Sequence, residues 1–408
     1  MERESAYTAP ATDAHGADLY HALGESDTCR KLATAFYAHV AHDPVLRPLY
    51  PPTLKGCPIN ALAAFFIQFF GGPCEYAPRR WNLSLRDLHL RFAIGQRERD
   101  AWLTDMFLAL KDLRVEEPVR SALRWFFVQS SAYFMNQPSG ATDTSSYLQE
   151  CLGGDQAEWE VSRLHQEIQE RWQAQCMLEE MVAAVRQGNA EVVLAMIEAP
   201  MMQAFFTRDH GAFLSVIALL SGSRHPALVD YARRKLVATP GLAQEHYTYE
   251  LTLLHVLAGQ GRLAMVELLL HLGADPNAQN PSGQTPLYWV GNGAPGADGA
   301  AVVRVLAQHG AQVDAQEKLK QCTPLHMAAR RGNVQVAAAL LECGADLEVR
   351  DKLGDTPLHR AIKCGKTDMV AFLLERGANA QAEGKGGVPP WQAARGARMK
   401  QLLQSSER

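Results

Sequence analysis

Histidine and cysteine are the residues of this 408-residue chain whose chemistry depends most on their spacing. Fourteen histidines and eight cysteines could in principle supply metal sites, redox pairs or nucleophiles. The cysteines are scattered, however: none forms a C-x-x-C pair, and no Cys/His cluster has the spacing of a zinc site. Because the start, Met1–Ser5, is charged and lacks the apolar segment of a signal peptide, we expect free thiols in a reducing cytoplasm.

Phosphate-binding and charge-driven functions find little support in the sequence. The segment Gly71-Gly72-Pro73 is not followed by Gly-Lys-Ser/Thr, so we interpret it as a corner that ends a helix. A net charge of -4 gives no support to nucleic acid or an anionic membrane as a partner. The longest apolar stretches fall short of the roughly 20 residues that span a bilayer. With 47% hydrophobic and 21% charged residues, the chain has the composition of a globular protein.

A polar motif recurs in the second half of the chain. Thr-Pro-Leu-His occupies 323–326 and 356–359, and close variants occupy 285–288 and 252–255. An alanine-rich helix, a second helix and Gly-Ala follow each copy. This pattern, with its period of 33 residues, resembles the ankyrin repeat and implies an α-solenoid that binds a protein and has no chemistry of its own. The repeat histidines are predicted to form hydrogen bonds in the turns rather than to ligate metal; they are His255, His326 and His359.

The repeat pattern weakens at both ends, as the caps of a solenoid require. Residues 176–250 are predicted to form divergent units, 251–384 the regular repeats, and 385–408 a C-terminal cap around Trp391. An insertion at 291–299 is rich in glycine, and we expect it to form an exposed, mobile loop.

The first half is distinguished by its aromatic residues. Of the 32 aromatics, 22 lie in residues 1–172 and 10 in the remaining 236, so the two halves must fill their cores differently. Apolar periodicity in the first half is helical throughout, with helices predicted over 29–42, 60–70, 98–113 and 117–134. No strand pattern competes, and the fold class is therefore predicted to be all-α.

Several ordered motifs in this half resemble the truncated haemoglobins. They are Phe36-Tyr37-Ala38-His39-Val40, Leu49-Tyr50-Pro51, Phe65-Phe66-Ile67-Gln68-Phe69-Phe70-Gly71-Gly72-Pro73, Leu88-His89-Leu90-Arg91-Phe92-Ala93-Ile94 and Ala101-Trp102-Leu103. Tyr50, Trp102 and the Gly-Gly-Pro corner are marks of the group II branch. The resemblance covers residues 18–137 and implies a two-over-two helical sandwich around haem b.

The resemblance also implies roles for individual residues. His89 matches the proximal ligand of the haem iron, and its other ring nitrogen should donate to a backbone carbonyl. Tyr37, Tyr50 and Trp102 match the polar aromatics that donate hydrogen bonds to a bound diatomic ligand. Leu62, beside Pro58 on the distal side, has no donor, so a distal His or Gln gate is absent. The remaining predicted pocket residues are the apolar Phe66, Leu88, Phe92 and Ile94, and Arg91 as a partner of a haem propionate.

The predicted organisation is thus a tail at 1–17, a globin domain at 18–137, a linker and connecting helix at 138–175, and the ankyrin array at 176–408. The function that fits is binding of dioxygen, and of nitric oxide or carbon monoxide, by the globin domain. The ankyrin array would then dock this domain to an unidentified protein. Three alternatives stay open. They are a haem-based gas or redox sensor, a nitric-oxide dioxygenase or peroxidase-like enzyme supplied with electrons from elsewhere, and a haem-free interaction module.

Overall fold

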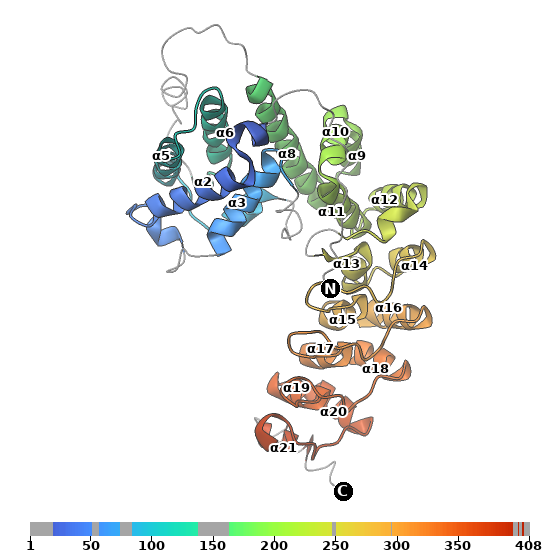
Figure 1. The fold of residues 1–408 in the computed structure, drawn as a ribbon. Coiled ribbons are helices and arrows are strands. Elements are labelled where there is room, and N and C mark those ends of the chain that lie inside the picture. The colour runs from blue at the N-terminus through green and yellow to red at the C-terminus, as the bar shows by residue number, and fades with distance from the viewer. Residues whose placement is uncertain are drawn as a thin grey trace, which may run out of the picture. The chain divides into compact units, whose positions relative to one another are not determined.

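The computed structural model describes residues 19–50, 57–73, 84–137, 163–246, 250–294, 296–394, 399 and 402–403. The predicted tail at 1–17 and the linker motifs at 138–146 lie outside these residues. The chain divides into two compact units, both built from helices, and no strand occurs in the described part (Figure 1). Among the described residues, the first unit holds those up to Glu180 together with Pro200–Phe205, and the second holds the rest.

The first unit is a sandwich of two helical pairs. Its elements are α1 (Leu19–Leu23), α2 (Glu25–Val40), η1 (Arg47–Leu49), α3 (Cys57–Phe69), α4 (Leu85–His89), α5 (Gln96–Asp112), α6 (Val119–Tyr133) and the first part of α8 (Arg163–Gln187). Helix α2 packs on α3 and on α5, and α5 packs on α6. Aromatic rings fill the centre, where Phe69 of α3 stacks on Phe126 of α6 with centroids 4.6 Å apart. The predicted all-α, two-over-two arrangement is confirmed.

Helix α8 extends the first unit beyond its predicted end at residue 137. Leu164, Ile168 and Trp172 recur every four residues on one face of this helix, and all three are buried in the same core as α2, α3, α5 and α6. The segment predicted as a linker and connecting helix, 138–175, therefore contributes from Arg163 onward to the core of the first unit. The second unit begins at Met181, compared with the predicted residue 176.

The second unit is a stack of helical pairs (Figure 1). Its elements after α8 are α9 (Ala190–Glu198), α10 (Pro200–Arg208, shared with the first unit), α11 (His210–Ser221), α12 (Pro226–Ala238), η3 (Pro240–Ala243), α13 (Leu253–Gly259), α14 (Leu263–His271), α15 (Pro286–Asn292), α16 (Gly296–Gln308), α17 (Pro324–Arg331), α18 (Val334–Glu342), α19 (Pro357–Lys363), α20 (Thr367–Glu375), η5 (Lys385–Gly387) and α21 (Pro390–Ala393). First helices contact first helices and second helices contact second helices along the stack from α13 to α20. No single described helix is long and apolar enough to cross a bilayer. Helices α9 and α10 meet that test only as a pair bent by 67°.

The repeated glycines end the second helices as predicted. Gly273, Gly310, Gly344 and Gly377 have φ angles of 88°, 86°, 91° and 90°, in the left-handed region where a side chain would be strained. At the opposite end of each pair, a threonine precedes the first helix and a proline occupies its first turn in α15, α17 and α19. Helix α21, at the predicted cap, packs on α19.

The predicted loop at 291–299 is helical at most of its described residues, although Gly293 and Asp298 are exposed as expected. Gly291 is the penultimate residue of α15 and is buried, Ala294 is fully buried, and α16 begins at Gly296. A Cβ atom at Gly291 would lie within 2.4 Å of the Pro324 carbonyl oxygen, and one at Gly299 within 2.8 Å of a Val336 methyl carbon. The glycines of the insertion therefore allow neighbouring helices to approach closely.

Candidate functional site

His89 is the last residue of α4, a short helix that is fixed at both ends. At its start, the Ser84 hydroxyl accepts a hydrogen bond from the Asp87 amide at 3.1 Å. At its end, His89 Nδ1 donates to the Leu85 carbonyl oxygen at 2.8 Å, because a carbonyl can only accept. The expected hydrogen bond from His89 to a backbone carbonyl is confirmed.

This hydrogen bond fixes the tautomer of His89. Burial lowers the pKa of the imidazole, and the charge of Arg91 lowers it further. The hydrogen bond to Leu85 and the charge of Glu179 act in the opposite direction and raise this pKa. The neutral ring therefore carries its proton on Nδ1 and its lone pair on Nε2. No described residue forms a hydrogen bond with Nε2, so this nitrogen is free to bind a metal ion.

Two residues that the sequence did not single out hold His89 in place. The ring of Phe134 stacks on the imidazole with centroids 4.3 Å apart. Asn136 Nδ2 donates to the carbonyl oxygens of Phe92 at 2.7 Å and His89 at 3.3 Å, and its Oδ1 accepts from the Ile94 amide at 3.0 Å. Both follow α6, and nothing in their local sequence distinguishes them from ordinary residues at the end of a helix.

The three predicted polar aromatics lie around Phe36. Tyr37 and Tyr50 meet edge to face at 5.5 Å, and Trp102 lies 5.5 Å from Phe36, which is itself 5.3 Å from Tyr37. Neither tyrosine hydroxyl nor the indole N–H forms a hydrogen bond with another described residue. Three side chains that each carry one donor thus belong to one aromatic cluster.

A buried carboxyl group stands beside this cluster. Asp105 of α5 is buried, and its Oδ2 has no hydrogen-bond partner among the described residues. Burial, together with the charge of Asp43, raises the pKa of Asp105 to about 6, while His39 lowers it. Burial raises the pKa of Tyr37 to about 12, and burial, Tyr37 and Asp105 together raise that of Tyr50. Both tyrosines therefore remain hydrogen-bond donors at neutral pH.

The other predicted pocket residues differ in how deeply their side chains are buried. Leu62 of α3, Phe92 and Ile94 are half-buried, and Leu88 is 41% exposed. Phe66 is fully buried and stacks on Phe70 at 5.4 Å, so it belongs to the core of the sandwich. Arg91 is exposed and its guanidinium lies 4.7 Å from the Phe92 ring centroid.

Comparison with known proteins identifies the first unit. Residues 18–132 match the family described as bacterial-like globin. Over 127 residues the chain is 32% identical to group 2 truncated hemoglobin YjbI of Bacillus subtilis, covering 31% of this chain and 94% of that protein. The chain belongs to the truncated haemoglobins. Its globin domain is therefore of a haem-binding family.

The second unit matches ankyrin repeats. The family descriptions "Ankyrin repeats (many copies)" and "Ankyrin repeats (3 copies)" cover residues 241–287 and 292–383. Over 97 residues, 24% of this chain, it is 36% identical to cyclin-dependent kinase inhibitor 2A of Homo sapiens, of which it spans 59%. It is 35% identical to cyclin-dependent kinase 4 inhibitor B of Mus musculus, of which it spans 71%. This truncated haemoglobin thus carries a protein-interaction framework after its globin domain.

The donor set of the truncated globin domain fits haem. His89 Nε2 offers the lone pair of a neutral imidazole whose tautomer is fixed, as a haem ligand requires. Arg99 supplies a second, independent indication. Its side chain is 1% exposed, Nε donates to the Ser131 hydroxyl at 3.3 Å, and neither terminal nitrogen has a hydrogen-bond partner among the described residues. The nearest carboxylate contact is 3.9 Å, to Asp100. A buried guanidinium with free donors calls for an anion, and a haem propionate is one.

The repeat histidines have the hydrogen-bonding role predicted for them. His326 Nδ1 lies 2.8 Å from the Thr323 hydroxyl, and Nε2 donates to the Asp355 carbonyl oxygen of the next repeat at 3.0 Å. His255 and His359 repeat this arrangement. No described group of histidines, cysteines and carboxylates is placed to hold a metal ion.

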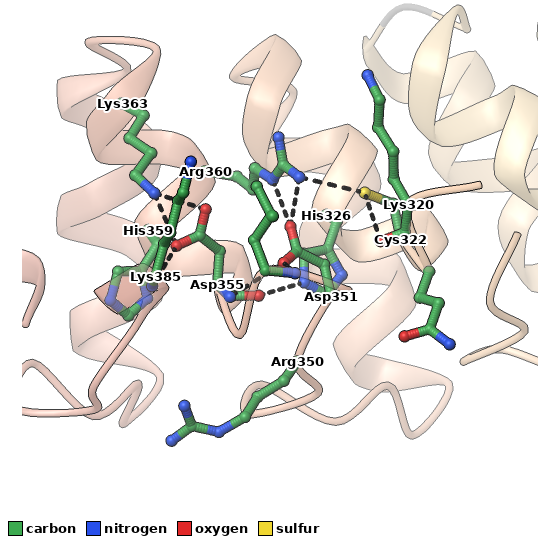
Figure 2. A network of polar contacts seen from close by, with 12 residues as sticks. Lys320, Cys322, His326, Arg350, Asp351, Asp355, His359, Arg360, Lys363 and Lys385 are labelled. Atoms are coloured by element: carbon green, nitrogen blue, oxygen red, sulfur yellow. Dashed lines mark hydrogen bonds and ion pairs between the residues drawn. The ribbon is translucent and has the colours of Figure 1, made fainter. Parts of the chain in front are cut away.

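Buried carboxylates of the ankyrin repeats form ion pairs with basic side chains. Figure 2 shows Arg360 between Asp351, to which its Nε donates at 2.8 Å, and the Cys322 sulfur, which its Nη2 reaches at 3.7 Å. Lys363 Nζ lies 2.6 Å from Asp355 Oδ2 in the same view. These pairs fix the hairpins that connect the repeats.

A cavity of about 140 Å³ opens beside this network. Its walls include Tyr288, Leu319, Met327 and Arg330. Leu319 is 64% exposed at the tip of its hairpin, and Leu353 of the next hairpin is 48% exposed. The cavity is lined by polar and charged side chains as well as apolar ones, and it lies beside leucines that are exposed on adjacent hairpin tips.

Proposed function

We propose that the globin domain binds haem b with His89 as the axial ligand, that the haem binds dioxygen, and that the ankyrin array docks this domain to a protein. The observation that carries the proposal is the hydrogen bond from His89 Nδ1 to Leu85, which leaves Nε2 with its lone pair available. Family membership supports haem, and the three donors around Phe36, which have no hydrogen-bond partner among the described residues, support a polar diatomic ligand.

Each residue then has a defined task. Haem iron supplies the reversible binding of a diatomic ligand. His89 holds the group from one side through Nε2, with Phe134 and Asn136 fixing its ring and backbone. Tyr37, Tyr50 and Trp102 donate to a ligand that carries partial negative charge, so they slow its release. Arg99 pairs with a propionate, a role that the sequence suggested for Arg91.

The ankyrin array contributes binding and no chemistry. Its exposed leucines, Leu319 and Leu353, and the cavity beside Tyr288 form one docking surface on consecutive hairpins. Two of its ankyrin relatives are inhibitors of cyclin-dependent kinases, and we infer that the side chains on the hairpins of this chain select its own partner.

An absorbance spectrum of the full chain reconstituted with haem tests the proposal. We expect a Soret band, a stable spectrum of the oxygenated ferrous form, and loss of the band in His89→Ala. The matched control is His42→Ala, because His42 is exposed and bonds only to the Ala38 carbonyl of its own helix. A Soret band that survives unchanged in His89→Ala would overturn the assignment of the ligand.

A further inference from the structure

The proximal helix α4 is covered by a helix that lies beyond the globin family match. That match ends at residue 132, whereas α8 begins at Arg163. Trp172 of α8 meets Phe134 at 6.2 Å and Tyr133 at 5.6 Å, both edge to face. Because Phe134 stacks on His89, the aromatic contacts run without a break from α8 to the imidazole.

A buried carboxylate of α8 makes the polar contact with α4. Glu179 is 5% exposed, and it accepts a hydrogen bond from the amide of Leu85, the first residue of α4. Gln175, one turn earlier on α8, donates to the same carboxylate at 2.9 Å. Glu179 is therefore held in place by its own helix while it caps the start of the proximal helix.

Leu85 joins this carboxylate to the imidazole. Its amide donates to Glu179, and its carbonyl oxygen accepts the Nδ1–H of His89 at 2.8 Å. A negative charge beside Leu85 makes that carbonyl a stronger acceptor, since charges act over several ångströms where water is excluded. A stronger acceptor increases the basicity of the ligating nitrogen, as partners of metal-bound histidines do in general.

We propose that Glu179 is a positioning residue for His89, which acts through Leu85 and sets how strongly the imidazole donates to haem iron. The inference rests on the proposed haem ligation by His89. It makes α8 a functional part of the haem site. It also links α8, which continues to Gln187, to His89 through Leu85 and Phe134.

Resonance Raman spectroscopy of the full chain, reconstituted with haem and reduced without added ligand, tests the inference. The iron–histidine stretching band should shift to lower frequency in Glu179→Gln, because glutamine keeps the shape and one acceptor oxygen but removes the charge. Glu180→Gln is the matched control, since Glu180 is the exposed neighbour on the same helix. Its band should coincide with that of the unchanged chain.

Glu179→Asp distinguishes the effect of the carboxylate charge from the effect of the side-chain length. Aspartate retains the charge but is one methylene shorter, so we expect a band between those of the unchanged chain and Glu179→Gln. If both variants give the unchanged frequency, Glu179 does not act on His89 and the inference fails. If Glu179→Gln does not retain haem, the Glu179→Asp band alone tests the inference. A lower frequency than in the unchanged chain supports it, and an unchanged frequency contradicts it. Absence of an iron–histidine band from the unchanged chain would instead overturn the proposed ligation by His89.

Discussion

The imidazole of His89 and the ring of Phe134 lie almost parallel, 19° apart, with centroids separated by 4.3 Å. Phe134 follows directly after α6, so the stack ties α4 to the sandwich. An imidazole held in one orientation can present Nε2 to a metal ion without loss of side-chain entropy on binding. The stacking of Phe134 is therefore as much part of the site as the hydrogen bond to Leu85.

Phe134→Leu should weaken haem retention without unfolding the globin domain. Leucine preserves apolar burial but loses the stacked ring, and such pairs contribute about 0.5–1.5 kcal/mol beyond burial, or about 2- to 12-fold in a rate. We expect haem transfer to an excess of an apoglobin acceptor to accelerate by that factor. Phe372→Leu, in the ankyrin unit, is the control. Equal transfer rates in all three proteins would show that the stack does not hold His89.

Arg99→Met should act in opposite directions on the haem-free and haem-bound proteins. Removing a buried guanidinium whose terminal nitrogens have no hydrogen-bond partner among the described residues should raise the melting temperature of the haem-free chain. Removing the partner of a propionate should weaken haem binding by roughly tenfold or more, because charge-assisted hydrogen bonds contribute about 1.5–3 kcal/mol. Melting followed by circular dichroism and haem titration measure the two effects. A fall in both quantities would mean that Arg99 has a purely structural role.

Tyr37→Phe and Trp102→Phe should each accelerate dioxygen release by about tenfold, if one lost hydrogen bond is worth about 1.4 kcal/mol. Neither donor has a hydrogen-bond partner among the described residues, so each substitution removes no hydrogen bond within that part of the chain. Stopped-flow displacement of dioxygen by carbon monoxide gives the rates. Tyr231→Phe, whose hydroxyl bonds to Glu198 at 2.6 Å in the ankyrin unit, should leave them unchanged. Unaltered release in both distal variants would remove the polar aromatics from the ligand site.

The sequence could predict what local pattern and motif determine. Helical periodicity placed α2, α3, α5 and α6, and the recurring Thr-Pro and Gly-Ala placed the repeats, because period and turn chemistry are written in neighbouring residues. It could not predict Phe134, Asn136 or Glu179 as neighbours of His89. Each reaches the site from another helix or its end, and a contact between distant segments leaves no spacing to detect.

The unusual states of two buried groups also depend on tertiary context. Arg99 and Asp105 read as ordinary charged positions of an amphipathic helix, yet α5 is covered on both sides and buries them. Tertiary packing also explains the insertion at 291–299. Its glycines allow neighbouring helices to approach closely, whereas the sequence predicted a loop. In both places composition suggested solvent, and packing decided otherwise.

Asp105→Asn should stabilise the globin domain at neutral pH. Burial raises the pKa of Asp105 to about 6 from an ordinary value of 3.8, so the folded state binds its proton more tightly than the unfolded state. The stability that this proton supplies is present below about pH 4 and is lost as the pH rises through about 6. Asparagine does not titrate, so the Asp105→Asn variant does not lose stability in this way. Its melting temperature should exceed that of the unchanged chain at pH ~7.5 and approach it at pH ~4. The control is Asp27→Asn, a surface partner of Lys31. A difference that does not depend on pH would exclude titration of Asp105 as its cause.

The ankyrin unit should show the opposite dependence on pH because its buried histidines are neutral. Burial lowers the pKa of His255 to about 4, against the hydrogen bond to Gln284, and also lowers those of His326 and His359. The unfolded chain therefore binds more protons, and stability is lost as the pH falls from about 6.5 towards about 4.

His255→Asn tests this dependence. The Asn amide oxygen can still accept from the Thr252 amide, as Nδ1 does at 3.1 Å, but the donor to Gln284 is lost. We expect about 1–2 kcal/mol lower stability at neutral pH and a shallower loss on acidification. Urea unfolding of the full chain at pH ~7.5 and ~5, followed by circular dichroism, measures both. His271→Asn, at an exposed position of α14, should follow the unchanged chain. An equally steep loss in His255→Asn would assign the acid sensitivity to other groups.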